Sequence, residues 1–170
     1  SGYLGLTGDF LRRFKPLDTK FQMGFMLSKD FNFRADDLQL EAKVKFDSSY
    51  APSCPMVNLL VKGNKDYAWI TLGNKGCESN LAIKVGNRYV NGKTNDLSKL
   101  GIDIFSWANL HVKLSNARLT LSINNRVVEE ITYTNLLGDL KEVDVFFNGI
   151  GNISDVQIGN ETGNEMITAK

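Results

Sequence analysis

The sequence is poor in the residues that build metal centres, with one histidine and two cysteines among its 170 residues. A zinc site made entirely of several histidine and cysteine ligands is therefore excluded. Basic and acidic residues are almost balanced, because 20 Lys and Arg face 19 Asp and Glu, for a net charge of +1. Nucleic acids and anionic membrane surfaces call for a clear basic excess, so neither is expected as a partner.

Long apolar runs are also missing. No stretch approaches the roughly 18 apolar residues of a membrane-spanning helix, so we expect no membrane insertion. The chain shows no basic start followed by an apolar stretch, and we therefore expect no signal peptide within it. It opens Ser1-Gly2-Tyr3, which we interpret as a mature or trimmed chain, so the missing signal does not argue against export.

The two cysteines lie among turn-forming residues, Cys54 within Ala51–Pro55 and Cys77 within Gly73–Cys77. Two exposed free thiols would be a liability, whereas a disulfide that closes this loop would stabilise the fold by about 3.5 kcal/mol through chain entropy. We therefore expect a Cys54–Cys77 disulfide and an oxidising compartment. The alternative is two unpaired thiols in a reducing cytosol. A cysteine nucleophile is disfavoured, because the single candidate base, His111, lies on an expected strand.

Alternation with a period of two dominates the rest of the chain. In Leu38–Phe46 every second residue is apolar and those between are polar, which is typical of a strand with one face on the core and one in water. The same pattern recurs at Leu110–Leu114, Leu119–Ile123, 81–85 and 143–147. Turn signals rich in Asn and Gly separate these segments, as tight hairpins require.

The sequence thus predicts an all-β fold, a two-sheet antiparallel β-sandwich of about 10–12 strands. No long amphipathic helix is expected, and Asp9–Lys15 alone is expected to form a helical turn or two. Because no repeat or linker interrupts the pattern, we expect a single domain over 1–170, with a core at about 20–159 and a tail at 160–170.

A more specific pattern covers residues 107–158. A tryptophan precedes a strand in Trp107–Leu114, a strand–turn–strand hairpin follows in Arg118–Val127, and the string Gly-Ile-Gly-Asn-Ile-Ser-Asp-Val-Gln-Ile closes at Gly149–Ile158. This combination resembles the concanavalin A-like lectin/glucanase superfamily, and it is nearest to the laminin-G-like branch. The hairpin turn reads Asn124-Asn125 where the family often has Asn-Gly, and Asn also accepts a left-handed backbone.

The resemblance implies a jelly roll of two packed antiparallel sheets, one of them curved, with ligands on the concave face or at loop tips. We expect Trp107 to fill the space between the sheets. We expect no cofactor, with a structural calcium ion as the alternative, because laminin-G-like domains often hold one Ca²⁺. Its ligands would come from aspartates near expected strand ends, but no pair matches a family position, so the metal residues stay unknown: Asp36, Asp37, Asp96, Asp103 and Asp139.

The glucanase branch carries a Glu-x-Asp-x-(x)-Glu strand that places three carboxylates on one face. Here Glu142-Val143-Asp144 begins such a string, but Val145-Phe146-Phe147 follows and the second glutamate is absent. Glycoside hydrolysis needs an acid and a second carboxylate flanking one bond, so we interpret the pair as a solvated strand edge. His111 has no nucleophile elbow beside it and is expected to be an exposed strand histidine. We therefore expect that the chain is not an enzyme.

Aromatic side chains alternate with aliphatic ones in Tyr67–Leu72. If the aliphatic face is core, Tyr67 and Trp69 stand about 7 Å apart on the outer or concave face, where sugar rings could stack on them. The following hairpin would hydrogen-bond the hydroxyl groups through Arg88, Tyr89 and Asn91. The alternative is that both sheets are covered and Trp69 belongs to the core.

These observations favour a non-catalytic carbohydrate-binding or recognition module of an exported protein (periplasmic, cell-surface or secreted), with a glycan as its partner. The alternative is a laminin-G-like protein–protein adhesion or scaffold domain with an extracellular protein as its partner. A lesser alternative is a glycoside hydrolase-related enzyme. The first predicts an exposed Trp69 in a groove, and the third requires two carboxyl groups that face one cleft.

Overall fold

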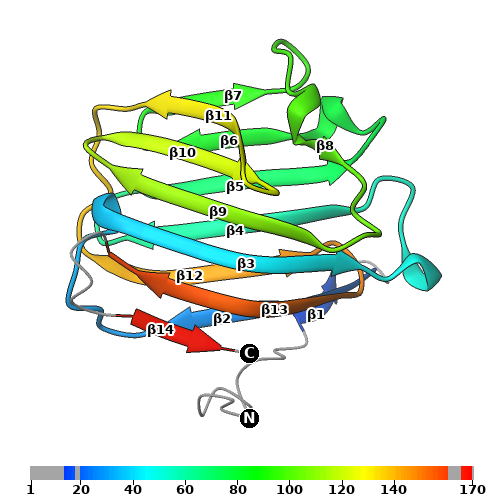
Figure 1. Cartoon of the computed structure of the whole chain (residues 1–170), viewed down its shortest axis with the longest axis horizontal. Coiled ribbons are helices and arrows are strands. Elements are labelled where there is room, and N and C mark those ends of the chain that lie inside the picture. Colours follow the sequence, from blue (N-terminus) through cyan, green and yellow to red (C-terminus); the bar gives the residue numbers. More distant parts are fainter. Residues whose placement is uncertain (1–13, 18–19, 161–165, 170) are drawn as a thin grey trace.

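The computed structural model describes residues 14–17, 20–160 and 166–169, and it consists of two β-sheets that pack face to face (Figure 1). One sheet has eight strands in the order β1-β2-β12-β4-β5-β6-β7, with β8 beside β5. The other has six, in the order β11-β10-β9-β3-β13-β14. The all-β sandwich expected from the alternation is confirmed.

The described strands have the following bounds: β1 (Phe14–Leu17), β2 (Lys20–Ser28), β3 (Leu38–Phe46), β4 (Met56–Gly63), β5 (Tyr67–Asn74), β6 (Ala82–Val85), β7 (Arg88–Asn91), β8 (Gly101–Ile102), β9 (Ala108–Ser115), β10 (Arg118–Ile123), β11 (Arg126–Thr132), β12 (Leu140–Phe147), β13 (Gly151–Gly159) and β14 (Met166–Ala169). Short 3₁₀ helices lie at η1 (Ala35–Asp37), η2 (Ser48–Tyr50), η3 (Glu78–Asn80) and η4 (Ser98–Leu100). Within the described ranges, no helix has the length and apolar character needed to cross a membrane.

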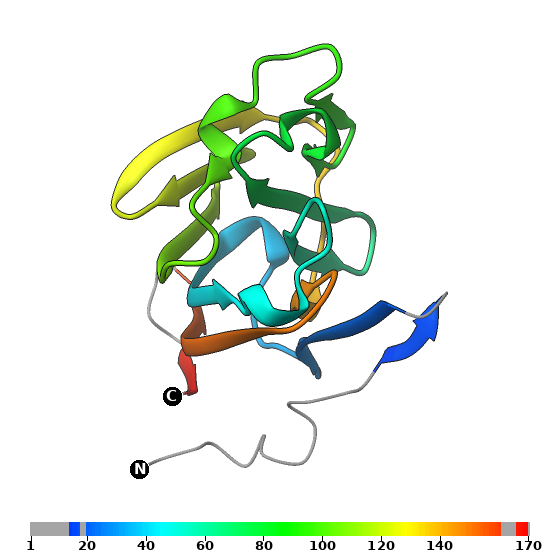
Figure 2. The same cartoon turned by 90° about the vertical axis from the view of Figure 1, so that its right-hand side faces the viewer.

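The strand count exceeds the expected 10–12 for local reasons. Phe14–Leu17 forms β1, where the sequence predicted the end of a helical turn from Asp9; the residues before Phe14 lie outside the described ranges. Met166–Ala169 lies in the expected tail but pairs with β13 as an edge strand. Neighbouring strands run antiparallel except β5 and β8, which are parallel. Figure 2 shows β1 (bright blue) beside the outer end of β2 (dark blue), projecting from the rest of the sandwich.

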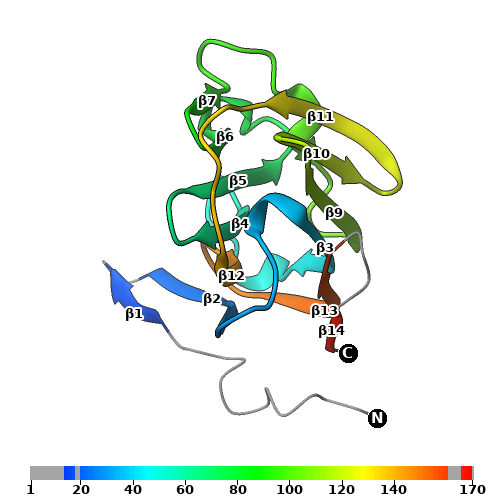
Figure 3. The ribbon, with the colours of Figure 1, turned by 90° about the vertical axis from the view of Figure 1, so that its left-hand side faces the viewer.

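The core lies between the sheets, and period-two alternation decides which side chains enter it. In β3 the apolar residues from Leu38 to Phe46 are at most 3% exposed, whereas the alternate residues face solvent or are half-buried. Each such Leu, Val or Phe stabilises the fold by about 1.5–3 kcal/mol. In Figure 3 the sandwich is seen from one end, with β7 and β11 at its upper edge and β2 and β14 at its lower edge.

Trp107 does not fill the space between the sheets, so that prediction is wrong. Its side chain is 49% exposed, and the next residue, Ala108, takes the buried position at the start of β9. Phenylalanines fill this end of the core instead: Phe46 packs edge-on against Phe147, with ring centroids 5.5 Å apart, and against Phe105 at 6.2 Å. Alternation along β9 turns the tryptophan outward because Leu110 and Val112 occupy the core side.

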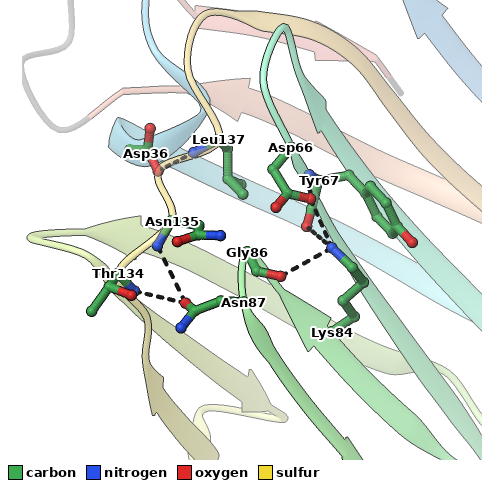
Figure 4. A network of polar contacts seen from close by, with 9 residues as sticks. All are labelled: Asp36, Asp66, Tyr67, Lys84, Gly86, Asn87, Thr134, Asn135 and Leu137. Carbon is green, nitrogen blue, oxygen red and sulfur yellow. Dashed lines mark hydrogen bonds and ion pairs between the residues drawn. The ribbon is translucent and has the colours of Figure 1, made fainter.

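Two features hold the loops. The expected disulfide joins Cys54, just before β4, to Cys77, just before η3, with Cα atoms 5.7 Å apart. Asp36 is 9% exposed, and its carboxylate accepts hydrogen bonds from the Tyr133 hydroxyl and from the main-chain N–H groups of Leu137 and Gly138, each 2.9 Å long. This carboxylate fixes the connection between β11 and β12 to η1. Asn87, in the turn between β6 and β7, accepts hydrogen bonds from the main-chain N–H groups of Thr134 and Asn135 in the same connection (Figure 4).

Candidate functional site

The outer face of the eight-stranded sheet carries the aromatic residues singled out above. Ala68, Ile70 and Leu72 of β5 are buried in the core, so alternation turns Tyr67 and Trp69 outward, where they are 37% and 38% exposed. The alternative, a core Trp69, is not what the structure shows.

A groove of about 320 Å³ lies on this face, centred on β4, β5 and β6. It is lined by three aromatic residues, two amides, two small residues, a methionine and a lysine: Tyr67, Trp69, Tyr89, Asn58, Asn80, Thr71, Ala82, Met56 and Lys84. The groove therefore brings together three of the five residues proposed from the sequence.

Arg88 and Asn91 do not line the groove. Arg88 pairs with Val85, a core residue, whereas Tyr89 pairs with Lys84 on the outer face, so Arg88 and Tyr89 lie on opposite sides of β7. The Asn91 side-chain oxygen accepts hydrogen bonds from the main-chain N–H of Lys93 (3.0 Å) and the hydroxyl of Thr94 (3.5 Å). It stabilises its own turn, as Asn side chains often do.

Asn58 is a groove residue that the sequence reading missed. It is 8% exposed, and its Oδ1 accepts hydrogen bonds from Trp69 Nε1 and Thr71 Oγ1, both 2.9 Å long. Because the indole nitrogen can only donate, this contact fixes the orientation of the amide. The hydrogen bonds among the described residues leave Asn58 Nδ2 without an acceptor. The available signal was a lone amide in the apolar run Val57–Val61.

Two contacts hold the aromatic rings. The Trp69 indole packs edge-on against Phe146 of β12, with centroids 5.8 Å apart at an interplanar angle of 80°. Lys84 Nζ lies 3.6 Å from the centre of the Tyr67 ring and 2.7 Å from Asp66 Oδ1, an arrangement that Figure 4 shows. Burial alone would raise the pKa of Asp66, but hydrogen bonds from Lys84 and from the Tyr67 N–H lower it. Both rings are thus restrained before any ligand arrives.

Two carboxyl groups lie on the same face. Glu142 and Asp144 alternate with the core residues Val143 and Val145, so both point outward from β12. Asp144 is 6% exposed, and its Oδ1 has no hydrogen-bond partner among the described residues. Burial, the charge of Glu142 and a hydrogen bond to Glu142 raise the pKa of Asp144 to about 7, although Lys62 opposes the rise.

The interpretation of this pair as a solvated strand edge is therefore wrong. β12 is an internal strand, paired with β2 on one side and β4 on the other, so its outward side chains have neighbours on both sides. The sequence showed the alternation of Glu142 and Asp144, but it contained no information on which strands flank them.

The aspartates considered for calcium do not come together. The carboxylate of Asp36 accepts the hydrogen bonds of the loop described above. Asp103 accepts hydrogen bonds from Phe105 N–H and the Ser106 hydroxyl, and Asp96 accepts one from Ser98 N–H. In the part of the chain that the structure covers, no group of three or more His, Cys, Asp or Glu side chains could hold a metal ion. These residues do not fit the calcium ion implied by the laminin-G-like resemblance.

Comparison with known proteins gives the class of fold. No family model and no curated protein matches this chain. Among solved structures, an apo Crh5 transglycosylase superposes with a TM-score of 0.56 at 11% identity, over 91% of this chain and 74% of that one. The binding domain of botulinum neurotoxin DC in complex with SialylT superposes with a TM-score of 0.51 at 12% identity, over 87% of this chain and 40% of that one. A Bacillus licheniformis β-glucanase superposes with a TM-score of 0.46 at 11% identity, over 89% of this chain and 78% of that one.

The chain has the concanavalin A-like jelly-roll fold, as the pattern over residues 107–158 predicted. The finer assignment to the laminin-G-like branch stays a prediction. The expectation that the chain is not an enzyme is contradicted, because proteins of this fold that resemble it include a transglycosylase. The exclusion rested on the missing second glutamate and on the interpretation of Glu142 and Asp144 as a solvated strand edge, and the burial of Asp144 contradicts that interpretation.

Proposed function

We propose that this chain binds carbohydrate in the groove around Trp69, on the outer face of the eight-stranded sheet. The main support for this proposal is the environment of Trp69. Its side chain is 38% exposed in a groove, and a hydrogen bond to Asn58 and edge-on packing against Phe146 fix its ring. Sugar rings present apolar C–H faces that stack on aromatic rings. A ring that is already fixed loses little conformational entropy when a ligand stacks on it.

The polar groups of the groove suit the hydroxyl groups of a sugar. The Trp69 N–H is bonded to Asn58, so the indole offers its ring surface, while Asn58 Nδ2 offers two donors beside it. Tyr89, which is 65% exposed, also lines the groove and adds an aromatic residue with a hydroxyl group. A mainly apolar groove with a few placed polar groups is the usual form of a small-molecule site.

The similar folds support a glycan as the ligand, and the disulfide supports a location outside the cytosol. The similar folds include a transglycosylase and a toxin binding domain in complex with SialylT. The Cys54–Cys77 disulfide favours an oxidising compartment. We therefore propose that the protein is exported and acts outside the cytosol, with a glycan as its partner.

The test is binding of neutral hexasaccharides (cellohexaose, laminarihexaose, xylohexaose and chitohexaose) and of a broad glycan array. A Trp107→Phe variant leaves Trp69 as the single tryptophan, and its fluorescence should shift on titration with a bound glycan. Trp69→Ala and Tyr89→Ala should each weaken binding by about tenfold or more, roughly 1.4 kcal/mol. Tyr50→Ala is the matched control, because Tyr50 is 66% exposed outside the groove. Equal losses in all three variants, or no bound glycan, would refute the proposal.

A second candidate is chemistry on the bound glycan, and the state of Asp144 favours it. A carboxyl group with a pKa of about 7 holds a proton near neutral pH, as a general acid must. Because Asp144 is covered, half-buried Glu142 would have to deliver this proton to the glycan. The two carboxyl groups of a glycosidase stand about 5 Å or more apart, so this adjacent pair would act together as one of them. Incubation of the bound hexasaccharide followed by mass spectrometry should then show cleaved or transferred products. Unchanged hexasaccharide after prolonged incubation would exclude this candidate.

A further inference from the structure

The acid pair and the aromatic groove lie on one continuous row of the sheet. Asp144 pairs in register with Leu60, and Leu60 pairs with Trp69. Two strand spacings, about 10 Å, therefore separate the backbones of Asp144 and Trp69. Phe146, two residues beyond Asp144, is in contact with the Trp69 ring. A ligand longer than one sugar ring that lies across the strands would reach from the groove to the pair.

Within the described part of the chain, few charged side chains face Asp144 from the elements packed around it. Its own strand contributes Glu142, and β4 contributes Lys62, which pairs in register with Glu142. On the other side, β2 presents Met26 opposite Asp144 and Ser28 opposite Glu142, and neither side chain titrates in the neutral range. Among the side chains that the structure describes, two carboxyl groups and one ammonium group therefore set the protonation of this part of the face.

We propose that the Glu142–Asp144 pair is the second half of the glycan site, and that an oligosaccharide binds together with one proton held by this pair. The inference rests on the proposed function and adds a regulation by pH. Glu142 is the carboxylate within reach of the glycan, because it is half-buried and Asp144 is covered. Asp144 acts through Glu142 as a positioning residue.

The direction in which pH changes the affinity depends on which carboxyl group is still hydrated before the glycan binds. Asp144 is 6% exposed, so a glycan removes almost no water from it, whereas half-buried Glu142 loses hydration under the ligand. Two adjacent carboxylates repel more strongly as water leaves. The occupied site thus favours the singly protonated pair, and by linkage the affinity falls as pH rises through the titration range of the pair.

The experiment is isothermal titration calorimetry with the hexasaccharide that gives the strongest Trp69 fluorescence response, at pH 6, 7 and 8. We expect Kd to rise about three- to tenfold between pH 6 and pH 8. At pH 7 the enthalpy should differ between phosphate and Tris buffers in the direction of proton uptake. Asp144→Asn should have the same Kd at all three pH values and no proton uptake. Asp30→Asn removes a carboxylate of a 96% exposed side chain and should keep the wild-type profile.

The outcomes separate the two proposals. If a hexasaccharide binds and Trp69→Ala weakens it, but Kd is independent of pH or binding releases protons, this inference fails and the proposed function stands. If Asp144→Asn keeps the wild-type pH profile, the inference fails in the same way. If no hexasaccharide binds, the proposed function fails and this inference falls with it.

Discussion

Replacement of Asp144 by Asn should stabilise the protein at alkaline pH and do so progressively less as the pH falls. The pKa of Asp144 is about 7 in the folded protein and 3.8 as its ordinary value. Because the folded state binds this proton more tightly, the contribution of the carboxyl group to stability is complete below pH 3.8 and is lost as pH rises to 7. Each pH unit in that window is worth about 1.4 kcal/mol, so the full loss is about 4 kcal/mol.

The asparagine removes this loss, but it leaves a buried amide with unpaired groups, which costs about 1–3 kcal/mol at every pH. We therefore expect Asp144→Asn to be about 1–3 kcal/mol more stable than wild type at pH 8. Between pH 5 and pH 8 the difference between the two proteins should change by about 3 kcal/mol. Urea unfolding followed by tryptophan fluorescence measures it, with Asp30→Asn as the exposed control. A stability difference that is constant over this range would refute a buried carboxyl with a raised pKa.

Two further predictions concern the supports of the loops. The double variant Cys54→Ser/Cys77→Ser should lose about 3.5 kcal/mol of unfolding free energy, and a midpoint equal to that of wild type in urea would contradict a structural disulfide. Tyr133→Phe removes one of the four donors to Asp36 and should cost about 1–2 kcal/mol. Asp36→Ala should cost more, because it also leaves two main-chain N–H groups without their acceptor. The reverse order in urea unfolding would show that Asp36 does not fix this loop.

Much of the fold could be predicted because its signal is local. The alternation in Leu38–Phe46 predicted a half-buried strand, and the same residues are the buried face of β3. The aliphatic and aromatic faces of Tyr67–Leu72 were separable in the same way. Each of these inferences needs only a neighbouring residue or the next one along. The disulfide was expected for a different reason, because two exposed free thiols would be a liability, and the structure joins Cys54 and Cys77 across 23 residues.

The candidate site could be predicted only in part, because its other half depends on neighbours across strands. Trp69 and Asn58 are eleven residues apart and meet because β4 and β5 pair in one register. Arg88 was grouped with Tyr89, but pairing of β7 with β6 puts Arg88 on the side of the core residue Val85. An assignment of residues to a hairpin does not say which of them face the groove.

The sequence by itself determined that this chain forms strands, which side of each strand is apolar, and that Tyr67 and Trp69 share a face. Only the tertiary structure decided that β12 lies between β2 and β4, and therefore that Asp144 is buried beside Glu142. The physical reason is that a period of two fixes the direction of a side chain and leaves its surroundings open. Burial, pKa and the shape of the groove depend on which distant strands come to lie beside it.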